Sequence, residues 1–243
     1  MNDQGSNRMA GRFSNKVALV AGGTGGLGRA VSLAFLQEGA SVAVTFRRQE
    51  EFDALKQLAG PLASLLTGHQ VDVTNDVAAE KMVEAILAGQ QRLDVLVNTV
   101  GGYKAGMKFW ELDTKVLDQM LSLNLRSGYA LTRAVVPAML KQGAGAIVNI
   151  AARAAIDPPA AAAAYAASKA AAIAMMNSLA ADLKGTAVRV NSVLPSIFDT
   201  EPNRKAMPNA DFSKWPKPEE IARVILFLCS EDAKLVRGAS IPV

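Results

Sequence analysis

The sequence predicts a single α/β domain, with a doubly wound parallel sheet of six to seven strands and helices on both faces. From Lys16 onward, short β-branched or apolar runs alternate with longer amphipathic stretches, which is typical of βαβ units. The strand runs are almost continuously apolar, so both faces of the sheet must be covered, and right-handed crossovers then give a doubly wound order. A length of 243 residues suits one core of this kind.

Six segments are predicted strands, and residues 241–243 add a seventh. The six cover residues 17–22, 41–46, 69–73, 94–98, 146–151 and 188–195. The helices expected between them cover residues 27–38, 50–58, 77–88, 114–141, 165–184 and 218–230. Gly39 and Gly143 follow two of these helices as C-terminal caps, and residues 72–75 offer an N-cap before Val77. The alanine-rich residues 160–164 are interpreted as an ordered loop.

Composition and charge exclude several classes of protein. With 50% hydrophobic and 20% charged residues, the chain is neither disordered nor collagen-like. No apolar run approaches the ~18 residues that span a bilayer, and the polar first sixteen residues lack the apolar region of a secretory signal. The net charge of +4 is small and its basic residues are scattered, so we expect no nucleic-acid or membrane partner.

Cysteine and histidine usage excludes further kinds of site. The single cysteine, Cys229, rules out a disulfide framework and a cysteine-based zinc site, and it fits a reducing cytoplasm. The only histidine, His69, has no cluster of partner ligands near it in the sequence. We therefore expect a cytoplasmic protein without a metal centre.

A glycine-rich segment follows the first strand and opens the first helix. Gly22 allows a tight turn, Gly26 lets backbone N–H groups approach a pyrophosphate, and Gly28 permits close packing of helix on sheet. The helix N-terminus favours the anion. We therefore expect a Rossmann-type domain over residues 15–243 that carries both the dinucleotide and the catalytic site, after a flexible leader at 1–14. The expected cofactor contacts in this segment are Gly22, Thr24, Gly25, Gly26, Leu27 and Gly28.

The end of the second strand predicts which dinucleotide is bound. An acidic residue there would hydrogen-bond the ribose diol, but the sequence places Arg47 and Arg48 there instead. A carboxylate would repel a 2′-phosphate, whereas guanidinium groups pair with it. NADP(H) is therefore favoured, with Arg47 as the first candidate and NAD(H) as the alternative. The competing interpretation is that both arginines are solvated surface charges.

Tyr165 and Lys169 lie one turn apart on the same face of a predicted helix. A phenol has an ordinary pKa of about 10, so it is a poor acid–base group until a nearby ammonium favours the phenolate. Lys169 can be that neighbour. Chance also produces this spacing in an alanine-rich helix, so the pair alone does not establish catalysis.

Taken together and in order, these motifs resemble the classical short-chain dehydrogenase/reductase family from Phe13 to Val243. Its glycine motif is matched by residues 21–28, its Asn-Asn-Ala-Gly by residues 98–101, its helix asparagine by Asn124, its Tyr-x-x-x-Lys by Tyr165 and Lys169, and its Asn-Ser-Val-x-Pro-Gly by residues 191–196. The resemblance implies that Lys169 also holds the nicotinamide ribose and that Asn124 holds a proton-relaying water. Further implied cofactor contacts are Asp72, Val73, Asn98, Gly101, Lys169, Pro195 and Ile197.

One departure from the family pattern bears on mechanism. Relatives usually carry a serine at the end of the fifth strand, and Ala152 stands in that place, with no Ser or Thr between Ile150 and Ala164. Losing one donor to a substrate oxygen typically costs about 10²–10³ in turnover. The chain is therefore either impaired or acts on a substrate that does not need the serine. Arg153, the next residue, could meet a polar substrate or be an exposed surface charge.

Local segments resemble two different branches of this family. Residues 199–215 resemble a loop of quinonoid dihydropteridine reductases, which also have alanine in the serine place and a Gly-Gly-aromatic element like residues 101–103. In that branch the aromatic, here Tyr103, belongs to the substrate pocket. Trp215 ends the same loop, either as an anchor or as a substrate contact. Residues 216–230 and the C-terminal residues resemble bacterial 3-oxoacyl reductase-like members instead.

The expected activity is hydride transfer from NADPH to a small carbonyl or quinonoid substrate, with Tyr165 as proton donor and Lys169 beside it. A quinonoid dihydropteridine reductase-like activity is one alternative, and an NADP(H)-binding protein without turnover is another, which Ala152 keeps open. The substrate pocket is expected to include Tyr103, Ala152, Arg153 and Trp215. The resemblance also implies a homodimer or homotetramer that assembles through residues 114–141 and 165–184.

Overall fold

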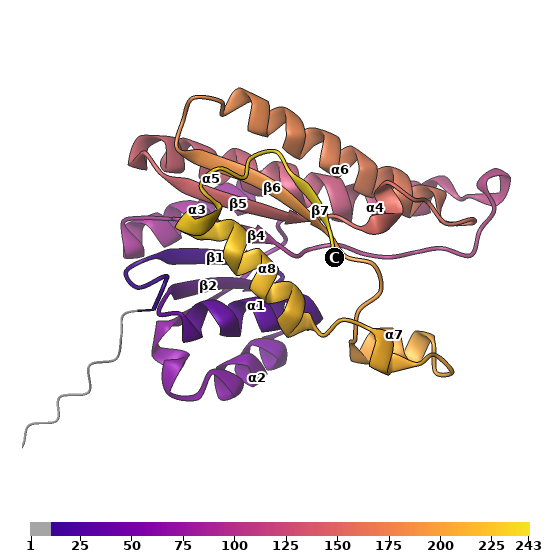
Figure 1. Ribbon diagram of the computed structural model, residues 1–243, viewed down its shortest axis with the longest axis horizontal. Helices are drawn as coiled ribbons and strands as arrows, with labels where there is room; N and C mark the ends of the chain where they lie inside the picture. The colour runs from indigo at the N-terminus through magenta and orange to yellow at the C-terminus, as the bar shows by residue number, and fades with distance from the viewer. Residues whose placement is uncertain (1–10) are drawn as a thin grey trace, which may run out of the picture.

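The computed structural model describes residues 11–243 and contains one parallel sheet in the order β3-β2-β1-β4-β5-β6-β7 (Figure 1). Every neighbouring pair is parallel, so the predicted doubly wound sheet is confirmed. The order reverses between β1 and β4, where such sheets bind their ligands. The strands are β1 (Val17–Ala21), β2 (Ser41–Phe46), β3 (Leu66–Gln70), β4 (Val95–Asn98), β5 (Gly145–Ile150), β6 (Val188–Leu194) and β7 (Ser240–Pro242).

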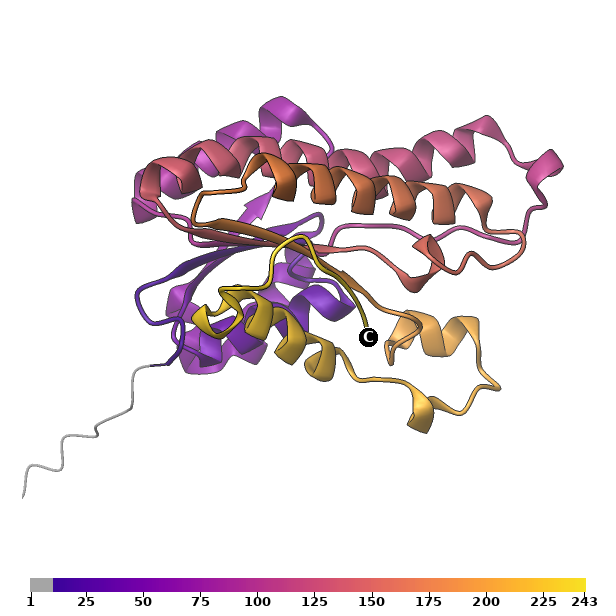
Figure 2. The ribbon, with the colours of Figure 1, turned by 45° about the horizontal axis from the view of Figure 1, so that its top comes forward.

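Helices cover both faces of the sheet, as Figure 2 shows: α3, α4, α5 and α6 lie on one face and α1, α2 and α8 on the other. Two separate apolar clusters fill the spaces between the sheet and these layers. The helices are α1 (Gly26–Gln37), α2 (Gln49–Ala59), α3 (Asp76–Gln90), α4 (Thr114–Leu121), α5 (Ser127–Gln142), α6 (Ala163–Asp182), α7 (Glu201–Ala206) and α8 (Pro218–Cys229). Short 3₁₀ turns occupy Gly60–Leu65, Phe109–Glu111, Arg153–Ala155, Phe212–Lys214 and Glu231–Ala233.

The predicted caps are found where the helices end and begin. Asn75 Oδ1 accepts a hydrogen bond from the Ala78 amide at 3.0 Å and so caps α3. Gly39 follows α1 with φ +86°, and Gly143 follows α5 with φ +74°. Local chemistry therefore sets these helix ends.

Strand β3 begins earlier than predicted, at Leu66 rather than His69. It is the edge strand of the sheet and pairs only with β2, from Val42 opposite Leu66 to Phe46 opposite Gln70. Only Leu66 is fully buried in it, because one face of the strand is largely open. The apolar residues that suggested the later position lie in the loop that follows, where Val73 is buried.

The long helix predicted over residues 114–141 is divided. A π-helical turn, Ser122–Arg126, lies between α4 and α5 and inserts an extra residue into each hydrogen-bonded ring. Helix α7 is an addition that the apolar pattern did not indicate, since none of its residues is buried. The predicted loop at 160–164 is helical from Ala163.

Residues 1–10 of the expected leader lie outside the described residues. Residues 11–14, expected to belong to it as well, are instead packed on α1: Phe13 is 3% exposed and stands edge-on to Phe35 at 4.8 Å between ring centroids. Among residues 11–243, no helix combines the length and the apolar character that crossing a bilayer requires.

Candidate active site

The predicted site residues gather at the edge of the sheet where the strands end. Because all seven strands run parallel, the loops after β1, β4, β5 and β6 leave from the same edge. The loop after β1 is the glycine-rich segment, and the loop after β4 begins at Thr99. The topology therefore brings together motifs that lie far apart in the sequence.

The glycine-rich loop is held by close backbone packing. Gly22 has φ +72°, a conformation that side chains rarely adopt, and its amide donates to Thr45 Oγ1 at 2.8 Å. A Cβ on Gly28 would lie 2.1 Å from the Gly22 carbonyl oxygen. Thr99 Oγ1 donates to the Ala21 carbonyl at 2.7 Å and so fastens the loop to the end of β4. The structure therefore has the tight turn predicted at Gly22 and the close packing predicted at Gly28.

The start of α1 has the properties of an anion site. Gly25 is its N-cap, no side chain caps the helix, and its first turn carries no acidic residue. Gly25 and Gly26 are exposed, whereas Leu27 points into the core and is 6% exposed. The free N–H groups and the helix dipole fit a pyrophosphate. The residues present therefore fit a dinucleotide, with Leu27 supporting the loop from below.

The two arginines after β2 have different surroundings. Arg48 Nε donates to Glu51 Oε1 at 2.9 Å, and the terminal guanidinium nitrogen of Arg48 pairs with the same oxygen. Glu51 Oε2 also accepts a hydrogen bond from Thr24 Oγ1 at 3.1 Å. Arg47 is exposed and forms no ion pair with any carboxylate in the part of the chain described. Arg47 is therefore the arginine whose guanidinium is available.

The carboxylate of Asp72 is used locally. Its Oδ1 accepts hydrogen bonds from the Thr74 amide at 2.9 Å and from the Thr74 hydroxyl at 2.8 Å. These bonds lower the pKa of Asp72, and the charge of Arg47 acts in the same direction. Val73 is buried beneath this turn. Asp72 and Val73, both predicted cofactor contacts, therefore lie in a hydrogen-bonded turn beside the end of β2.

Asn98 turns its side chain into the protein instead of toward the loop edge. Its Nδ2 donates to Asn149 Oδ1 at 3.0 Å, and its Oδ1 accepts from the Val100 amide at 3.1 Å. Its neighbour Thr99 makes the contact with the glycine-rich loop. The side chain of Asn98 thus shapes the turn after β4.

Tyr165 and Lys169 lie on α6 beside the turn after β4. Lys169 Nζ donates to the Ile150 carbonyl at 2.8 Å, and a Cβ on Gly101 would lie 3.1 Å from that same nitrogen. Burial lowers the pKa of Lys169 to about 8. Burial also raises the pKa of Tyr165 to about 12, and the Tyr103 hydroxyl acts in the same direction. The expected lowering of the Tyr165 pKa by Lys169 is thus not found, because burial dominates and the ammonium is directed at Ile150.

Asn124 connects three parts of this site. Its Oδ1 accepts from the Gly102 amide at 2.9 Å, and its Nδ2 donates to the Gly102 carbonyl at 3.0 Å and to Ser168 Oγ at 2.9 Å. Ser168 in turn donates to the Tyr165 carbonyl at 2.8 Å. The π-helical turn directs this side chain inward, since Asn124 is its one buried residue. Sequence reasoning did not identify Ser168, whose position between Tyr165 and Lys169 was its only signal.

Tyr103 lies beside the Tyr165 ring, and Ala152 follows the end of β5. The Tyr103 ring stands edge-on to that of Tyr165 at 4.8 Å between centroids, and 68% of Tyr103 is exposed. Ala152 is buried and follows β5 in extended backbone. Tyr103 is therefore a side chain next to Tyr165 that a bound molecule can reach.

The remaining predicted contacts lie in the segments that follow β5 and β6. Arg153 is exposed, and its amide donates to the carbonyl of the buried Pro195 at 2.9 Å. Ile197 is half-buried. Trp215 packs on Phe212 with ring centroids 4.9 Å apart, which is a contact within its own segment.

No group of three or more His, Cys, Asp or Glu residues is arranged to hold a metal ion among residues 11–243. His69 is half-buried in β3, and burial lowers its pKa. Cys229 is buried, which raises its pKa to about 12. Neither side chain contributes to the site.

Comparison with known proteins adds to this geometry. The profile of the family described as short chain dehydrogenase matches residues 16–211. The 3-oxoacyl-[acyl-carrier-protein] reductase FabG of Thermotoga maritima is 33% identical over 240 residues, which cover 96% of this chain and 97% of that protein.

Solved structures agree with this match. A short-chain type dehydrogenase/reductase from Mycobacterium ulcerans is similar with a TM-score of 0.90 at 25% identity, over 95% of this chain and 89% of the other. ElxO, whose structure holds NADP, is similar with a TM-score of 0.89 at 26% identity, over 94% and 96% of the two chains.

Proposed function

Since the chain belongs to the short-chain dehydrogenase/reductase family, we propose that it is an NADP(H)-preferring reductase of a small carbonyl or quinonoid substrate. The observation that carries the proposal is the convergence of three side chains on the residues after β4, beside the glycine-rich loop. Lys169 and Asn124 meet this segment at Gly101 and Gly102, and Tyr165 meets it at Tyr103. A tyrosine placed at a dinucleotide site has the geometry needed to protonate the oxygen or nitrogen of a bound substrate.

The chain's own residues would hold the cofactor at the carboxyl ends of β1 and β4. The N–H groups at Gly25 and Gly26 would bind the pyrophosphate, and Lys169 would bind the nicotinamide ribose beside Gly101. When bound, NADPH supplies a hydride to the substrate. The protein contributes orientation and electrostatics to this transfer.

The preference for NADP(H) rests on Arg47. Its guanidinium is exposed at the end of β2, where the adenosine ribose of such cofactors lies, and no carboxylate among residues 11–243 pairs with it. A guanidinium binds a phosphate with paired hydrogen bonds. The similar protein ElxO, crystallised with NADP, also supports the proposal. NAD(H) is the alternative.

The phenol of Tyr165 is protonated at neutral pH, and burial, which raises its pKa to about 12, makes it a weaker acid than a free tyrosine. Lys169, with a pKa of about 8, is mostly charged at pH 7. Its ammonium, which donates to the Ile150 carbonyl, would hold the nicotinamide ribose. Asn124 fixes α6 against the turn after β4 through Ser168, so the tyrosine is positioned rather than mobile.

A quinonoid dihydropterin is the second candidate substrate. Ala152 offers no hydroxyl to polarise an unactivated ketone, whereas a quinonoid ring is already activated and becomes aromatic on reduction. Tyr103, edge-on to Tyr165, provides a face for such a ring. Arg153 and Trp215 would line the outer part of the pocket.

Turnover assays would test these proposals. NADPH and NADH oxidation would be followed with quinonoid dihydropterin and with ketones, aldehydes and 3-oxoacyl thioesters. Turnover of the pterin with little on the other compounds would establish the quinonoid assignment, and turnover of a ketone or thioester would establish a general carbonyl reductase. Tight NADPH binding with no turnover of any compound would identify a cofactor-binding protein instead.

We also propose that the chain self-associates as a dimer or tetramer through α4, α5 and α6. These helices lie side by side on one face of the molecule (Figure 2). On α5, Tyr129 and Leu140 are each 44% exposed, which gives this layer apolar contacts to offer. Sedimentation analysis of the wild type and of Leu140→Lys would test this assembly.

A further inference from the structure

Glu51 occupies an unusual position between two elements of the proposed cofactor site. Its carboxylate accepts hydrogen bonds from Thr24, in the glycine-rich loop, and from Arg48, after β2. A phosphate on the adenosine ribose would need a hydroxyl and a guanidinium of this kind. The Glu51 carboxylate therefore already occupies the Thr24 hydroxyl and the Arg48 guanidinium.

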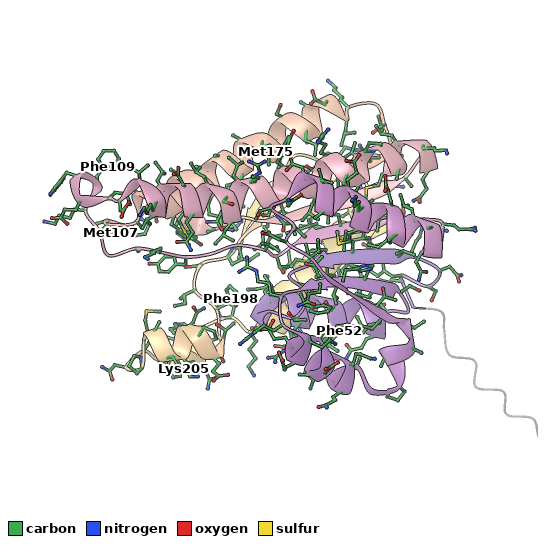
Figure 3. The ribbon with its side chains drawn as sticks, turned by 180° about the vertical axis from the view of Figure 1, so that it is seen from behind. Phe52, Met107, Phe109, Met175, Phe198 and Lys205 are labelled. Atoms are coloured by element: carbon green, nitrogen blue, oxygen red, sulfur yellow. The ribbon has the colours of Figure 1, made fainter. Side chains whose placement is uncertain are left out.

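The position of Glu51 is fixed by packing. Phe52, the next residue, stacks on Phe46 with ring centroids 4.9 Å apart and planes within 2°. On its other side, Phe52 covers Gly68 so closely that a Cβ there would lie 2.5 Å from the ring. Figure 3 labels Phe52 between α2 and the sheet. The first turn of α2 is therefore anchored, and Glu51 faces the glycine-rich loop.

Stabilisation of the helix does not account for both contacts of Glu51. A carboxylate in the first turn of a helix interacts favourably with its dipole, and Glu50 already supplies one. Glu51 does more than this, because it reaches a residue on another element. Arg48 lowers the pKa of Glu51, with Thr24 and Arg47 acting in the same direction, so the carboxylate is ionised at neutral pH.

We propose that Glu51 weakens the preference of this chain for NADPH over NADH by competing with the 2′-phosphate for Arg48 and Thr24. The inference rests on the proposed cofactor and concerns the strength of the preference. A bound 2′-phosphate must displace the Glu51 carboxylate or lie next to it. Two negative charges that share the same hydrogen-bond donors repel each other. A ribose 2′-hydroxyl can instead donate to the carboxylate. Arg47 favours the phosphate, and Glu51 opposes it.

The test is binding of NADPH and NADH to Glu51→Gln, with Glu50→Gln as the matched control. Both variants remove one negative charge from the first turn of α2, but only Glu51 contacts Thr24 and Arg48. Titration followed by nicotinamide fluorescence measures binding without turnover. We expect Glu51→Gln to tighten NADPH binding about tenfold and to leave NADH binding within about threefold of the wild type. Glu50→Gln removes a charge that acts on Arg48 only through space, so it should tighten NADPH binding by less than about threefold.

A second variant shows whether Arg48 mediates the effect. In Arg48→Met, the further change Glu51→Gln should tighten NADPH binding clearly less than tenfold, because the released guanidinium is gone. Equal effects of Glu51→Gln and Glu50→Gln, or weaker NADPH binding in Glu51→Gln, would overturn the inference. The proposed preference itself fails separately, if wild-type protein binds NADH as tightly as NADPH and Arg47→Ser changes neither affinity.

Discussion

The glycine-rich loop with its supports and the outer segments of the site are built in different ways. Gly22, Gly28, Thr45 and Thr99 fix the loop through backbone packing and hydrogen bonds of 2.7–2.8 Å from Thr99 and to Thr45. The outer segments, residues 103–113 and 199–217, are far more open: Phe109 and Trp110 are 76% and 77% exposed.

Figure 3 shows Met107, Phe109 and Lys205 at the same end of the molecule, away from Phe52 and the sheet. Within residues 199–217, Arg204 pairs with Asp199 and lies over the Phe212 ring at 5.0 Å, so many contacts stay inside the segment. We call the glycine-rich loop with its supports the packed half and these two outer segments the open half. We propose that the packed half sets cofactor binding and proton transfer, and that the open half sets the choice of substrate. The predictions below test this division.

The largest effect on stability is expected from Gly28→Ala. The new methyl group would lie 2.1 Å from the Gly22 carbonyl oxygen. The clash is with backbone, so α1 or the glycine-rich loop would have to move to relieve it. We expect the free energy of unfolding to fall by about 3 kcal/mol and NADPH binding to be lost. Chemical denaturation and fluorescence titration measure the two effects.

Gly89→Ala is the control for Gly28→Ala, because Gly89 is also helical and a Cβ there meets nothing within 4 Å. It should stabilise the protein by about 0.5 kcal/mol. Equal effects of the two variants would show that the loop is not fixed by close packing.

Lys169→Met should stabilise the protein in a pH-dependent way. The folded pKa of Lys169, about 8, lies below its ordinary value of 10.5, so between these values the unfolded chain binds more protons and stability rises with pH. Below about pH 8 the buried charge is present and costs stability. We expect the variant to be more stable by about 2 kcal/mol at pH 7 and by much less at pH 10.

Denaturation of Lys169→Met and wild type at each pH gives this difference, in which the titration of other groups cancels. A stability difference that does not change with pH would mean that burial does not disfavour the charged form of Lys169.

Ala152→Ser should restore a donor at the end of β5. If the wild type reduces unactivated ketones slowly because this hydroxyl is missing, the variant should reduce them about tenfold faster or more. Reduction of a quinonoid dihydropterin should stay within about twofold, because that ring needs less polarisation. Steady-state kinetics gives the ratio of variant to wild-type rates for each substrate. An equal gain in rate on the pterin and on the ketone would contradict the proposal that a quinonoid substrate does not need this hydroxyl.

The smallest effect is expected in the open half. Trp215→Ala removes the contact with Phe212 but no contact with the sheet core. We expect KM for substrate to rise about threefold, while the free energy of unfolding changes by less than about 0.5 kcal/mol and NADPH binding is unchanged. A loss of NADPH binding in this variant would show that the two halves are coupled.

Much of the packed half could be predicted from the sequence, because local chemistry determines it. Short, almost continuous apolar runs predicted the strands, Asn75 predicted the start of α3, and the glycine pattern predicted the loop after β1. The inward turn of Asn98 and the contact of Glu51 with Thr24 could not be predicted, since both depend on how distant elements pack. Edge strand β3 and helix α7 were misplaced or missed because they bury little.

The most direct test of the account compares NADPH binding and single-turnover NADPH oxidation in the wild type and in Tyr165→Phe, with the best substrate from the turnover assays. In Tyr165→Phe we expect NADPH binding within about twofold of the wild type and oxidation at least about 10²-fold slower, because only the proton donor is removed. Oxidation at the wild-type rate in Tyr165→Phe would contradict it and assign the proton transfer to another group.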